Sequence, residues 1–511
     1  MNFLRLIRSE SYKRGTVLSV LFNIVSKGIL FLLTIIIARY FGSSIKTDIY
    51  FFVYVAMILF SSFINSIDSA VLIPESMRLR QKEGNEKAAA FLNYFLLIYF
   101  IIGILFTVAM YFFGTTVFGL ISKFSETDIL AYRNYFWIGS CFFIFHVLTN
   151  YLNTILTSLK YFSLPMIISS IKSCIAIACI FLLKADYDVL SVFLAGLAAY
   201  AVNLIILLII MQKVAGWKFI VKPTTIQRSV WSNIFYAQLG QCTTVASSMF
   251  PLYLLSGFGS GIISDMNYGK NIADIPNTLV TAQVSNVSGI KLNEQVARKD
   301  YTGMNDTFVR TSKLLVFILV PLGFYLFVFA KPVVELFYNS KNFSETAASG
   351  SAIFLQLLAV TIFSIGVNTM VTRLFIAMQA IRQAFVYQVI LNVLLIAVIW
   401  MCTQYYGAYG FAYGTIIIHV VNYFGMYFIC SKLVAAVDYM AVLKYTGLIV
   451  LINGIIVTGL YFALQSVKAP GVLVLVSGFL VYLIILLIIN KKFRLNTDFS
   501  HIIKHVKQRF F

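Results

Sequence analysis

The sequence predicts an all-α integral membrane protein that crosses the bilayer about fourteen times. Of its 511 residues, 60% are hydrophobic and 11% are charged, whereas soluble domains have about 45–50% apolar and about 25% charged residues. Apolar runs of about 20 residues, long enough to cross roughly 30 Å of hydrocarbon, recur from Val17 almost to the C-terminus. Stretches such as Phe91 to Phe113 are continuously apolar, unlike the alternating strands of a membrane barrel. Helices are therefore expected throughout, because they satisfy their backbone groups internally.

Fourteen segments have the length and hydropathy of a membrane-crossing helix. In order, they cover residues 17–38, 49–73, 89–112, 134–157, 164–183, 189–212, 231–256, 263–289, 311–330, 351–372, 384–402, 409–431, 445–464 and 471–490. The first follows a basic start, MNFLRLIRSESYKRG, with no small-residue cleavage site after it, so we expect this start to be retained. The eighth, which contains DMNYGKNIADIPNTLVTAQVSN, is unusually polar, and the last is continuously apolar from Val472 to Ile489.

The 39 lysines and arginines, which give a net charge of +20, are distributed asymmetrically. About 27 lie on the termini and alternate loops and about eight on the opposite loops, which by the positive-inside rule places both termini in the cytoplasm. We predict a multi-pass protein of the bacterial inner membrane. The basic clusters lie beside spans, so anionic membrane lipids are the expected partners and nucleic acid is not. The basic tail is either an amphipathic surface helix or a solvated segment.

An internal duplication is the most informative feature. FGSSIKTD at Phe41 to Asp48 recurs as FGSGIISD at Phe258 to Asp265, an offset of 265 − 48 = 217 residues. Later matches keep the register: Asn150 with Asn368, Gly196 with Gly414 and Asn203 with Asn422, at offsets of 218, 218 and 219. Each copy precedes a span, and we expect Thr47-Asp48 and Ser264-Asp265 to act as N-caps.

The duplicated unit holds six spans, an even number, so both copies enter the membrane from the same face. We therefore predict two parallel six-helix lobes around a central cavity, as in many transporters. The N-terminal lobe would comprise residues 1–213 and the C-terminal lobe residues 214–432. Residues 433–490 would form two extra transmembrane helices, and residues 491–511 a basic cytoplasmic tail.

Charged residues inside the spans are the candidate substrate-binding groups, because each one is costly in lipid and needs a partner or water. The candidates are Lys27 in the first span, Asp68 in the second, and Lys270 and Asp274 in the eighth, together with the polar Asn271 beside Lys270. Lys270 and Asp274 are four residues apart, so they either line a cavity or neutralise each other. Two cations in an interior poor in charge suit an anionic substrate, particularly a phosphate on a lipid carrier.

Neither a metal site nor a cofactor is predicted. The six cysteines lie within or at the ends of apolar runs, without CxxC or Cys/His ligand spacing. The external loops are short and carry no paired carboxylates or histidine-centred group, so we do not expect an enzyme. The sequence leaves the oligomeric state open.

Several segments resemble the MurJ/MviN-like lipid II flippases, which belong to the multidrug/oligosaccharidyl-lipid/polysaccharide exporter superfamily. The resemblance rests on ARYFGSSIKTDIYFF, VLIPE with a basic loop after it, NYGKNIADIP, Pro321 and ELFYNSKNFSE. It covers the first twelve spans. Members of this family bind the pyrophosphate-sugar head of an undecaprenyl-linked precursor in a cationic central cavity. By this resemblance, Lys27 and Lys270 stand where the family carries arginines.

Two further arginines of the family have no counterpart, because Leu33 and either Ser61 or Ser62 occupy those positions. We therefore predict a flippase for another lipid-linked anionic glycan of the undecaprenyl pyrophosphate type, such as an O-antigen, capsule or exopolysaccharide unit. It would move this lipid-linked oligosaccharide outward by alternating access, for cell-surface polysaccharide or envelope biosynthesis. One alternative is a lipid II flippase of peptidoglycan synthesis. The other is a cation-coupled multidrug exporter, for which Asp68 and Asp274 are the candidate carboxylates.

Overall fold

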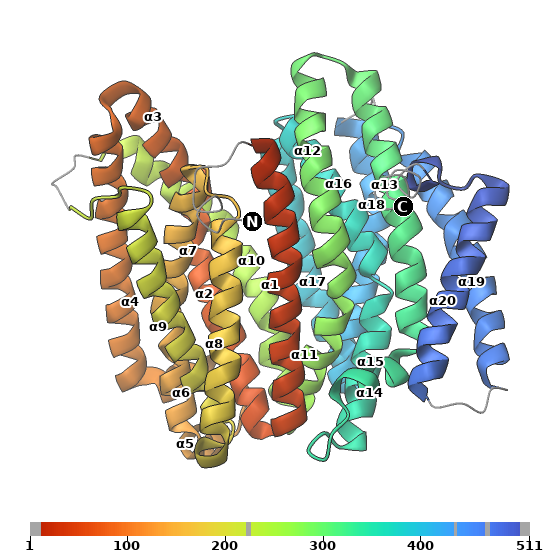
Figure 1. The fold of residues 1–511 in the computed structure, drawn as a ribbon, viewed down its shortest axis with the longest axis horizontal. Helices are drawn as coiled ribbons and strands as arrows, with labels where there is room; N and C mark the ends of the chain where they lie inside the picture. The colour runs from red at the N-terminus through yellow and green to blue at the C-terminus, as the bar shows by residue number, and fades with distance from the viewer. Residues whose placement is uncertain (1–11, 221–225, 434–436, 466–470, 501–511) are drawn as a thin grey trace. The chain divides into compact units, whose positions relative to one another are not determined.

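A computed structural model describes residues 12–220, 226–433, 437–465 and 471–500, which are almost entirely helical (Figure 1). The predicted all-α membrane fold is therefore confirmed. Ten helices in the described part are long and apolar enough to cross a membrane, or eleven if the bent pair α15 and α16 is one span. The number fourteen stays a prediction. Residues 1–11 of the basic start and residues 501–511 of the tail lie outside the described residues.

The chain forms two compact units. Unit 1 comprises Met1–Ser264 and Ser340–Phe343, and unit 2 comprises Asp265–Asn339 and Ser344–Phe511. The first unit therefore ends later than the lobe boundary at residue 213 that the duplication predicts. The reason is that α10 (Arg228–Leu255), the first span of the second copy, packs against α2 (Ile45–Ile67). The two units do not test the predicted division into duplicated lobes, which stays a prediction.

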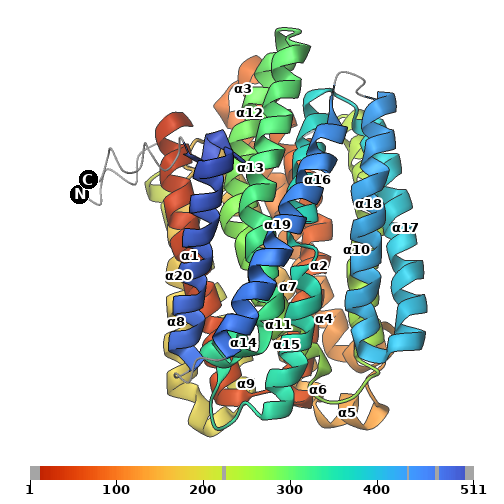
Figure 2. The same ribbon diagram turned by 90° about the vertical axis from the view of Figure 1, so that its right-hand side faces the viewer.

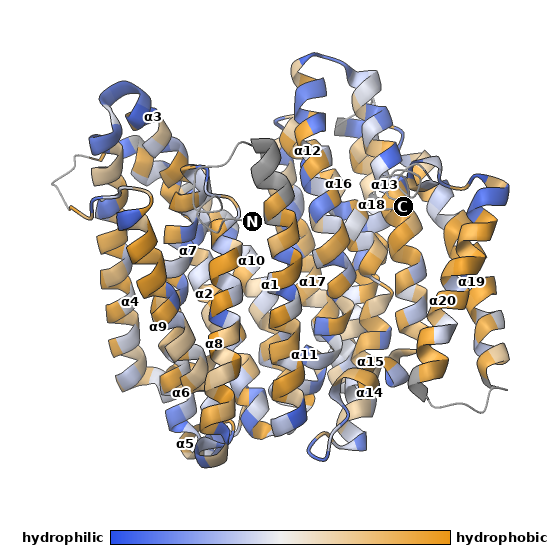
Figure 3. Ribbon diagram, viewed as in Figure 1, coloured by the Kyte–Doolittle hydropathy of each residue, from blue (hydrophilic) through white to orange (hydrophobic). Residues whose placement is uncertain are grey.

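Unit 1 is built around α2, which packs against α7 and α10, while α8 lies along α9 and α1. Its other helices are α1 Tyr12–Phe41, η2 Asp68–Leu72, α3 Ile73–Glu83, α4 Asn85–Ile121, α5 Glu126–Ala131, α6 Arg133–Ser140, α7 Phe142–Ser158, α8 Leu164–Tyr187 and α9 Leu190–Lys213. Apolar residues cover the middle of these helices and polar residues gather at ends such as α3 (Figure 3). This pattern is the one expected of helices that cross a bilayer.

Unit 2 packs around α13 (Tyr301–Val328), which contacts α12, α15, α16 and α19, while α17 lies along α18 (Figure 2). Its other helices are α11 Ile262–Ala273, which starts at the end of unit 1, η3 Asn277–Thr281, α12 Ala282–Ala297, α14 Ala330–Tyr338, α15 Glu345–Ala359, α16 Ile362–Ala377, α17 Ile381–Tyr406, η4 Gly407–Tyr409, α18 Gly410–Leu433, α19 Tyr439–Gln465 and α20 Gly471–Phe493. The Tyr482 hydroxyl donates to Asn453 Oδ1 at 2.6 Å and links α20 to α19.

The two sequence copies share local structure. Helix α2 begins at Ile45 and α11 at Ile262, and 262 − 45 = 217 is the offset of the repeated motif. Each of these helices leads into a π-helical turn, η2 or η3. A second repeated tetrapeptide, FSET, starts at Phe124 and at Phe343. Its serines cap α5 and α15 alike, because each Oγ accepts a backbone N–H three residues later at 3.1 Å.

Candidate functional site

The first copy of the motif does not cap its own helix in the predicted way. Ser44, not Thr47 or Asp48, is the N-cap of α2, because its extended backbone places Oγ over the first turn. Thr47 completes a capping box, in which its Oγ1 accepts the Ser44 N–H at 2.8 Å. The predicted caps are therefore wrong. Ser264 is likewise inside α11 and not before it.

Asp48 instead caps the helix that begins in the second copy. Its buried carboxylate accepts the backbone N–H groups of Gly261 at 2.6 Å and Ser264 at 2.7 Å, and the Ser264 hydroxyl at 2.6 Å. These donors lie at the start of α11, whose first-turn N–H groups have no acceptor within the helix. Hydrogen bonds from several donors to one carboxylate are among the strong interactions in proteins.

Further hydrogen bonds surround Asp48 and tie three segments of unit 1 together. They run from Ser43 Oγ to the Gly261 carbonyl (2.8 Å), from Ser340 Oγ to the Arg39 carbonyl (2.9 Å) and from Asn342 Nδ2 to the Tyr40 carbonyl (2.8 Å). The hydroxyl oxygens of Thr47 and Ser264 also lie within hydrogen-bond distance, 2.8 Å apart. We call these segments, residues 39–48, 261–264 and 340–343, the clasp.

Gly42 shows how closely the clasp is packed. Its φ is +64°, and a Cβ at this position would lie 2.1 Å from the backbone oxygen of Asn342. Only glycine adopts this backbone conformation without strain and leaves room for the neighbouring chain.

Lys270, Asn271 and Asp274 lie on α11 or directly after it, and the structure forms the ion pair between Lys270 and Asp274. The side chains of this pair are 47% and 41% exposed. In a predicted membrane span, a half-exposed charged pair requires water or a polar partner, which is compatible with the predicted cavity lining. Asn271, one residue along, is partly buried.

Lys27 and Asp68 have opposite surroundings. Lys27 is exposed near the middle of α1 in unit 1. Asp68, at the start of η2, is 1% exposed, and it accepts hydrogen bonds from Asn65 Nδ2 at 2.8 Å and from the Tyr99 hydroxyl at 2.6 Å. In this conformation the Asp68 carboxyl therefore contacts protein groups within unit 1. The assignment of all five predicted residues to substrate stays a prediction.

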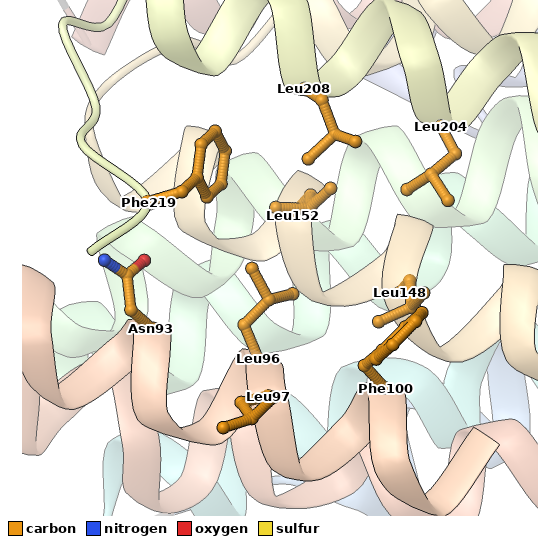
Figure 4. Close-up of a pocket in the computed structure, with 9 residues that line it drawn as sticks. All are labelled: Asn93, Leu96, Leu97, Phe100, Leu148, Leu152, Leu204, Leu208 and Phe219. Carbon is orange, nitrogen blue, oxygen red and sulfur yellow. The ribbon is translucent and has the colours of Figure 1, made fainter. Parts of the chain in front are cut away.

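An apolar pocket of about 260 Å³ lies between α4, α7 and α9 (Figure 4). Its lining consists of Leu96, Leu97, Phe100, Leu148, Leu152, Leu204, Leu208, Phe219 and the single polar residue Asn93. The Asn93 amide is engaged by the backbone carbonyls of Lys218 and Ile220 at 2.7 and 3.0 Å. This pocket suits hydrocarbon and offers no cation to a phosphate head.

The described residues hold no group of three or more His, Cys, Asp or Glu side chains arranged to bind a metal ion. The charged side chains of the clasp, of α1 and of α11 remain the candidate functional groups.

Comparisons with known proteins identify the family. A family model described as lipid II flippase MurJ matches residues 37–482. A solved structure of the lipid II flippase MurJ, in an inward closed conformation, has a TM-score of 0.75 and 22% identity, and covers 93% of this chain and 99% of that chain.

A multidrug resistance MATE family transporter of the MOP superfamily, in an inward-facing conformation, has a TM-score of 0.61 and 16% identity. The match covers 83% of this chain and 96% of that chain. These structures share the fold. No curated protein has a significantly similar sequence. Because the family model spans most of the sequence, the chain belongs to the MurJ family of lipid II flippases, which are membrane transporters and not enzymes.

Proposed function

We propose that this chain is a flippase that moves a lipid-linked glycan precursor across the membrane, with lipid II as its substrate. The match of the lipid II flippase family model to residues 37–482 carries this proposal. It favours lipid II over the O-antigen, capsule or exopolysaccharide unit that the missing arginines suggest. The fold likeness to multidrug transporters, at 16% identity, adds no support for drug export.

Three cationic or polar positions support binding of an anionic head group. Lys27 is exposed on a largely apolar helix, Lys270 is exposed on the polar helix α11, and Asn271 follows Lys270. A lysine ammonium binds phosphate as a compact point charge. At one of the positions without a family arginine, Ser61 is buried and donates its hydroxyl to the Ile58 carbonyl, so it supplies no cation there. The head would therefore depend on fewer positive groups than the family pattern provides.

The clasp would act as the gate of this transporter. The prediction of cytoplasmic termini puts the end of α1, and with it the clasp, at the outer face. Translocation by alternating access requires interactions that form in one state and break in another. The bonds from Gly261 and Ser264 to Asp48 are the candidates for such interactions, because they join segments that are 213 and 216 residues apart in sequence.

Depletion of the protein in its bacterial host tests the substrate. Mass spectrometry of lipid-linked glycans should show lipid II accumulating at the cytoplasmic face, followed by lysis. Accumulation of a different undecaprenyl-linked oligosaccharide in viable cells would replace lipid II with that glycan.

Substitution of the two lysines tests the head-group site. Lys27→Ala and Lys270→Ala should each reduce transport strongly while the protein still inserts, because each removes a cation from a predicted binding position. The matched control is Lys87→Ala, since Lys87 is exposed and pairs with Glu83 outside the candidate site. Undiminished transport in both variants would overturn the assignment.

A disulfide across the clasp tests the gate. The hydroxyls of Thr47 and Ser264 lie 2.8 Å apart, so Thr47→Cys with Ser264→Cys should cross-link under oxidation and stop transport until a reductant is added. Each single variant, in the same background of native cysteines, is the control. Full transport by a completely cross-linked protein would show that the clasp does not open.

Two finer points remain part of this proposal. The cytoplasmic position of both termini rests on the charge asymmetry of the loops. Anionic lipids would contact the basic residues of α3, where Arg78 already pairs with Glu75 at 2.5 Å and leaves Arg80 and Lys82 for the lipid surface.

A further inference from the structure

The interior of unit 1 holds a polar cluster apart from the clasp and from Lys27. Its members come from four helices: Tyr54 on α2, His146 on α7, Lys172 on α8 and Tyr200 on α9. The Lys172 Nζ lies 4.0 Å from the centre of the Tyr200 ring. The His146 ring lies 4.6 Å from the Tyr200 ring and 5.8 Å from the Tyr54 ring, measured between centroids. The hydroxyls of Tyr54 and Tyr200 are hydrogen-bonded to each other.

A small cavity adjoins this cluster. Lys172, Tyr54 and Tyr200 line it together with Leu30, Leu33, Tyr50, Phe142, Ser173, Ala176, Ile180, Val192, Gly196 and Ala199. The volume is about 30 Å³, which is enough to hold a water molecule. The cavity therefore has room for a water molecule or a monatomic ion.

Two nitrogen atoms of the cluster lack a hydrogen-bond or carboxylate partner among the described residues. His146 is 7% exposed, and its Nε2 has no hydrogen-bond partner in the described part of the chain. Lys172 forms no ion pair with a carboxylate of the described residues, and the titratable groups around it are His146, Tyr50, Tyr54 and Tyr200. None of them is acidic. The face of an aromatic ring stabilises an ammonium less than water does, so burial leaves this cation in need of an anion.

The equivalent place in the second copy of the repeat has neither the lysine nor the unpartnered histidine nitrogen. In the registers given by Asn150 with Asn368 and by Asn203 with Asn422, His146 corresponds to Ser364 and Tyr200 to His419. There the Ser364 hydroxyl and His419 Nδ1 form a hydrogen bond of 2.9 Å. At offsets of 217, 218 and 219, the counterpart of Lys172 is Val389, Ile390 or Leu391, all apolar. The fold itself therefore does not require a cation at this place.

We propose that the cavity of unit 1 binds a small monovalent inorganic anion, such as chloride, beside the Lys172 ammonium. The anion neutralises the lysine and so stabilises the packing of the helices that line the cavity. This proposal does not depend on the identity of the transported lipid.

Thermal unfolding of the purified full-length protein tests the proposal. Unfolding is followed in sodium chloride and in sodium gluconate at equal ionic strength and pH, because gluconate is too large for the cavity. Chloride or bromide should raise the melting temperature by a few degrees in a saturable way, as expected for a ligand that binds only the folded state. The same melting temperature in both salts at all concentrations would overturn the proposal. Lys172 would then be either uncharged or paired with water.

Variants locate the effect. Lys172→Ile introduces one of the three apolar residues that the second copy offers at this place, and it should abolish the difference in melting temperature between the two salts. Lys46→Met removes an exposed lysine paired with Asp188 and should keep this difference. If Lys172→Ile does not fold, Lys172→Gln replaces it, and bromide bound to the wild type is located by anomalous scattering. A bromide peak beside Lys172 supports the site. A halide effect that persists in both Lys172 variants, or bromide bound only elsewhere, refutes it.

Discussion

The two copies of the FGSxIxxD motif begin the same kind of helix but use their aspartates differently. Asp48 of the first copy caps the start of α11 through Gly261 and Ser264. Asp265 of the second copy is also buried, but it lies beside α15, where Ser351 Oγ is 3.5 Å from its carboxylate. The duplication has therefore preserved the backbone while giving one side chain a new partner. We therefore expect Asp48 to serve the function of the protein as well as its folding.

Removal of the Asp48 carboxylate should have the largest effect. Asp48→Ala leaves the backbone N–H groups of Gly261 and Ser264 without their acceptor, at about 1–3 kcal/mol for each buried orphan. If the clasp forms in one transport state only, the loss from a single orphan already shifts the balance of states by roughly 5- to 150-fold. We expect transport to fall at least tenfold, measured by complementation of a depleted strain, and the thermal stability of the purified protein to fall with it.

Asp48→Asn is the graded control, because it keeps one oxygen acceptor and should lie between the wild type and the alanine variant. Equal transport and stability in all three proteins would show that the bonds to Asp48 contribute nothing to either state.

Two glycines at equivalent positions of the repeat test how closely the backbone segments of the clasp are packed. Gly42 and Gly259, which are 259 − 42 = 217 residues apart, both have positive φ, +64° and +108°. A Cβ meets the Asn342 backbone at Gly42 and nothing within 4 Å at Gly259. Both alanine variants carry backbone strain of about 1–2 kcal/mol, but Gly42→Ala adds a steric clash. We expect the larger loss of stability and transport in Gly42→Ala, measured by thermal unfolding and complementation. A larger loss in Gly259→Ala would contradict the packing of the clasp.

The Ser264 hydroxyl should have a smaller effect than the Asp48 carboxylate. Ser264→Ala removes one of three donors to Asp48 and keeps both backbone donors, so the expected cost is about 1.5–3 kcal/mol at most. In a double-mutant cycle with Asp48→Ala, the two effects should be clearly less than additive, because both substitutions break the same bond. Additive free energies of unfolding would show that Ser264 acts through a different contact.

Local spacing was enough to predict some of these features. The continuous apolar runs predicted the helical membrane fold, and the four-residue spacing of Lys270 and Asp274 indicated their ion pair as one of two outcomes. The offset of 217 residues also predicted that α2 and α11 start at equivalent positions. In each case the interacting groups are neighbours in sequence or the backbone pattern is repeated.

Partners distant in sequence could not be read in this way. Asp48 looked like a cap for its own helix, since nothing local indicates that its acceptor oxygens reach Gly261. Asp68 was a candidate substrate-binding residue, and nothing near it in sequence indicated that the Tyr99 hydroxyl of α4 donates a hydrogen bond to its carboxylate. The repeated FSET was available as a signal, because the offset of 219 between Phe124 and Phe343 matches the register of the duplication.

The two FSET caps provide the smallest expected effect and a test of equivalence. Ser125 and Ser344 accept their backbone N–H groups at the same distance, 3.1 Å, and each is followed by a glutamate in the first turn. Replacing an N-cap serine by alanine costs about 0.5–2 kcal/mol. Ser125→Ala and Ser344→Ala should therefore lower the thermal stability by similar small amounts and leave transport close to that of the wild type. If only one of the two variants loses transport, the two FSET caps are not equivalent. The helix whose cap was removed would then take part in transport in addition to the clasp.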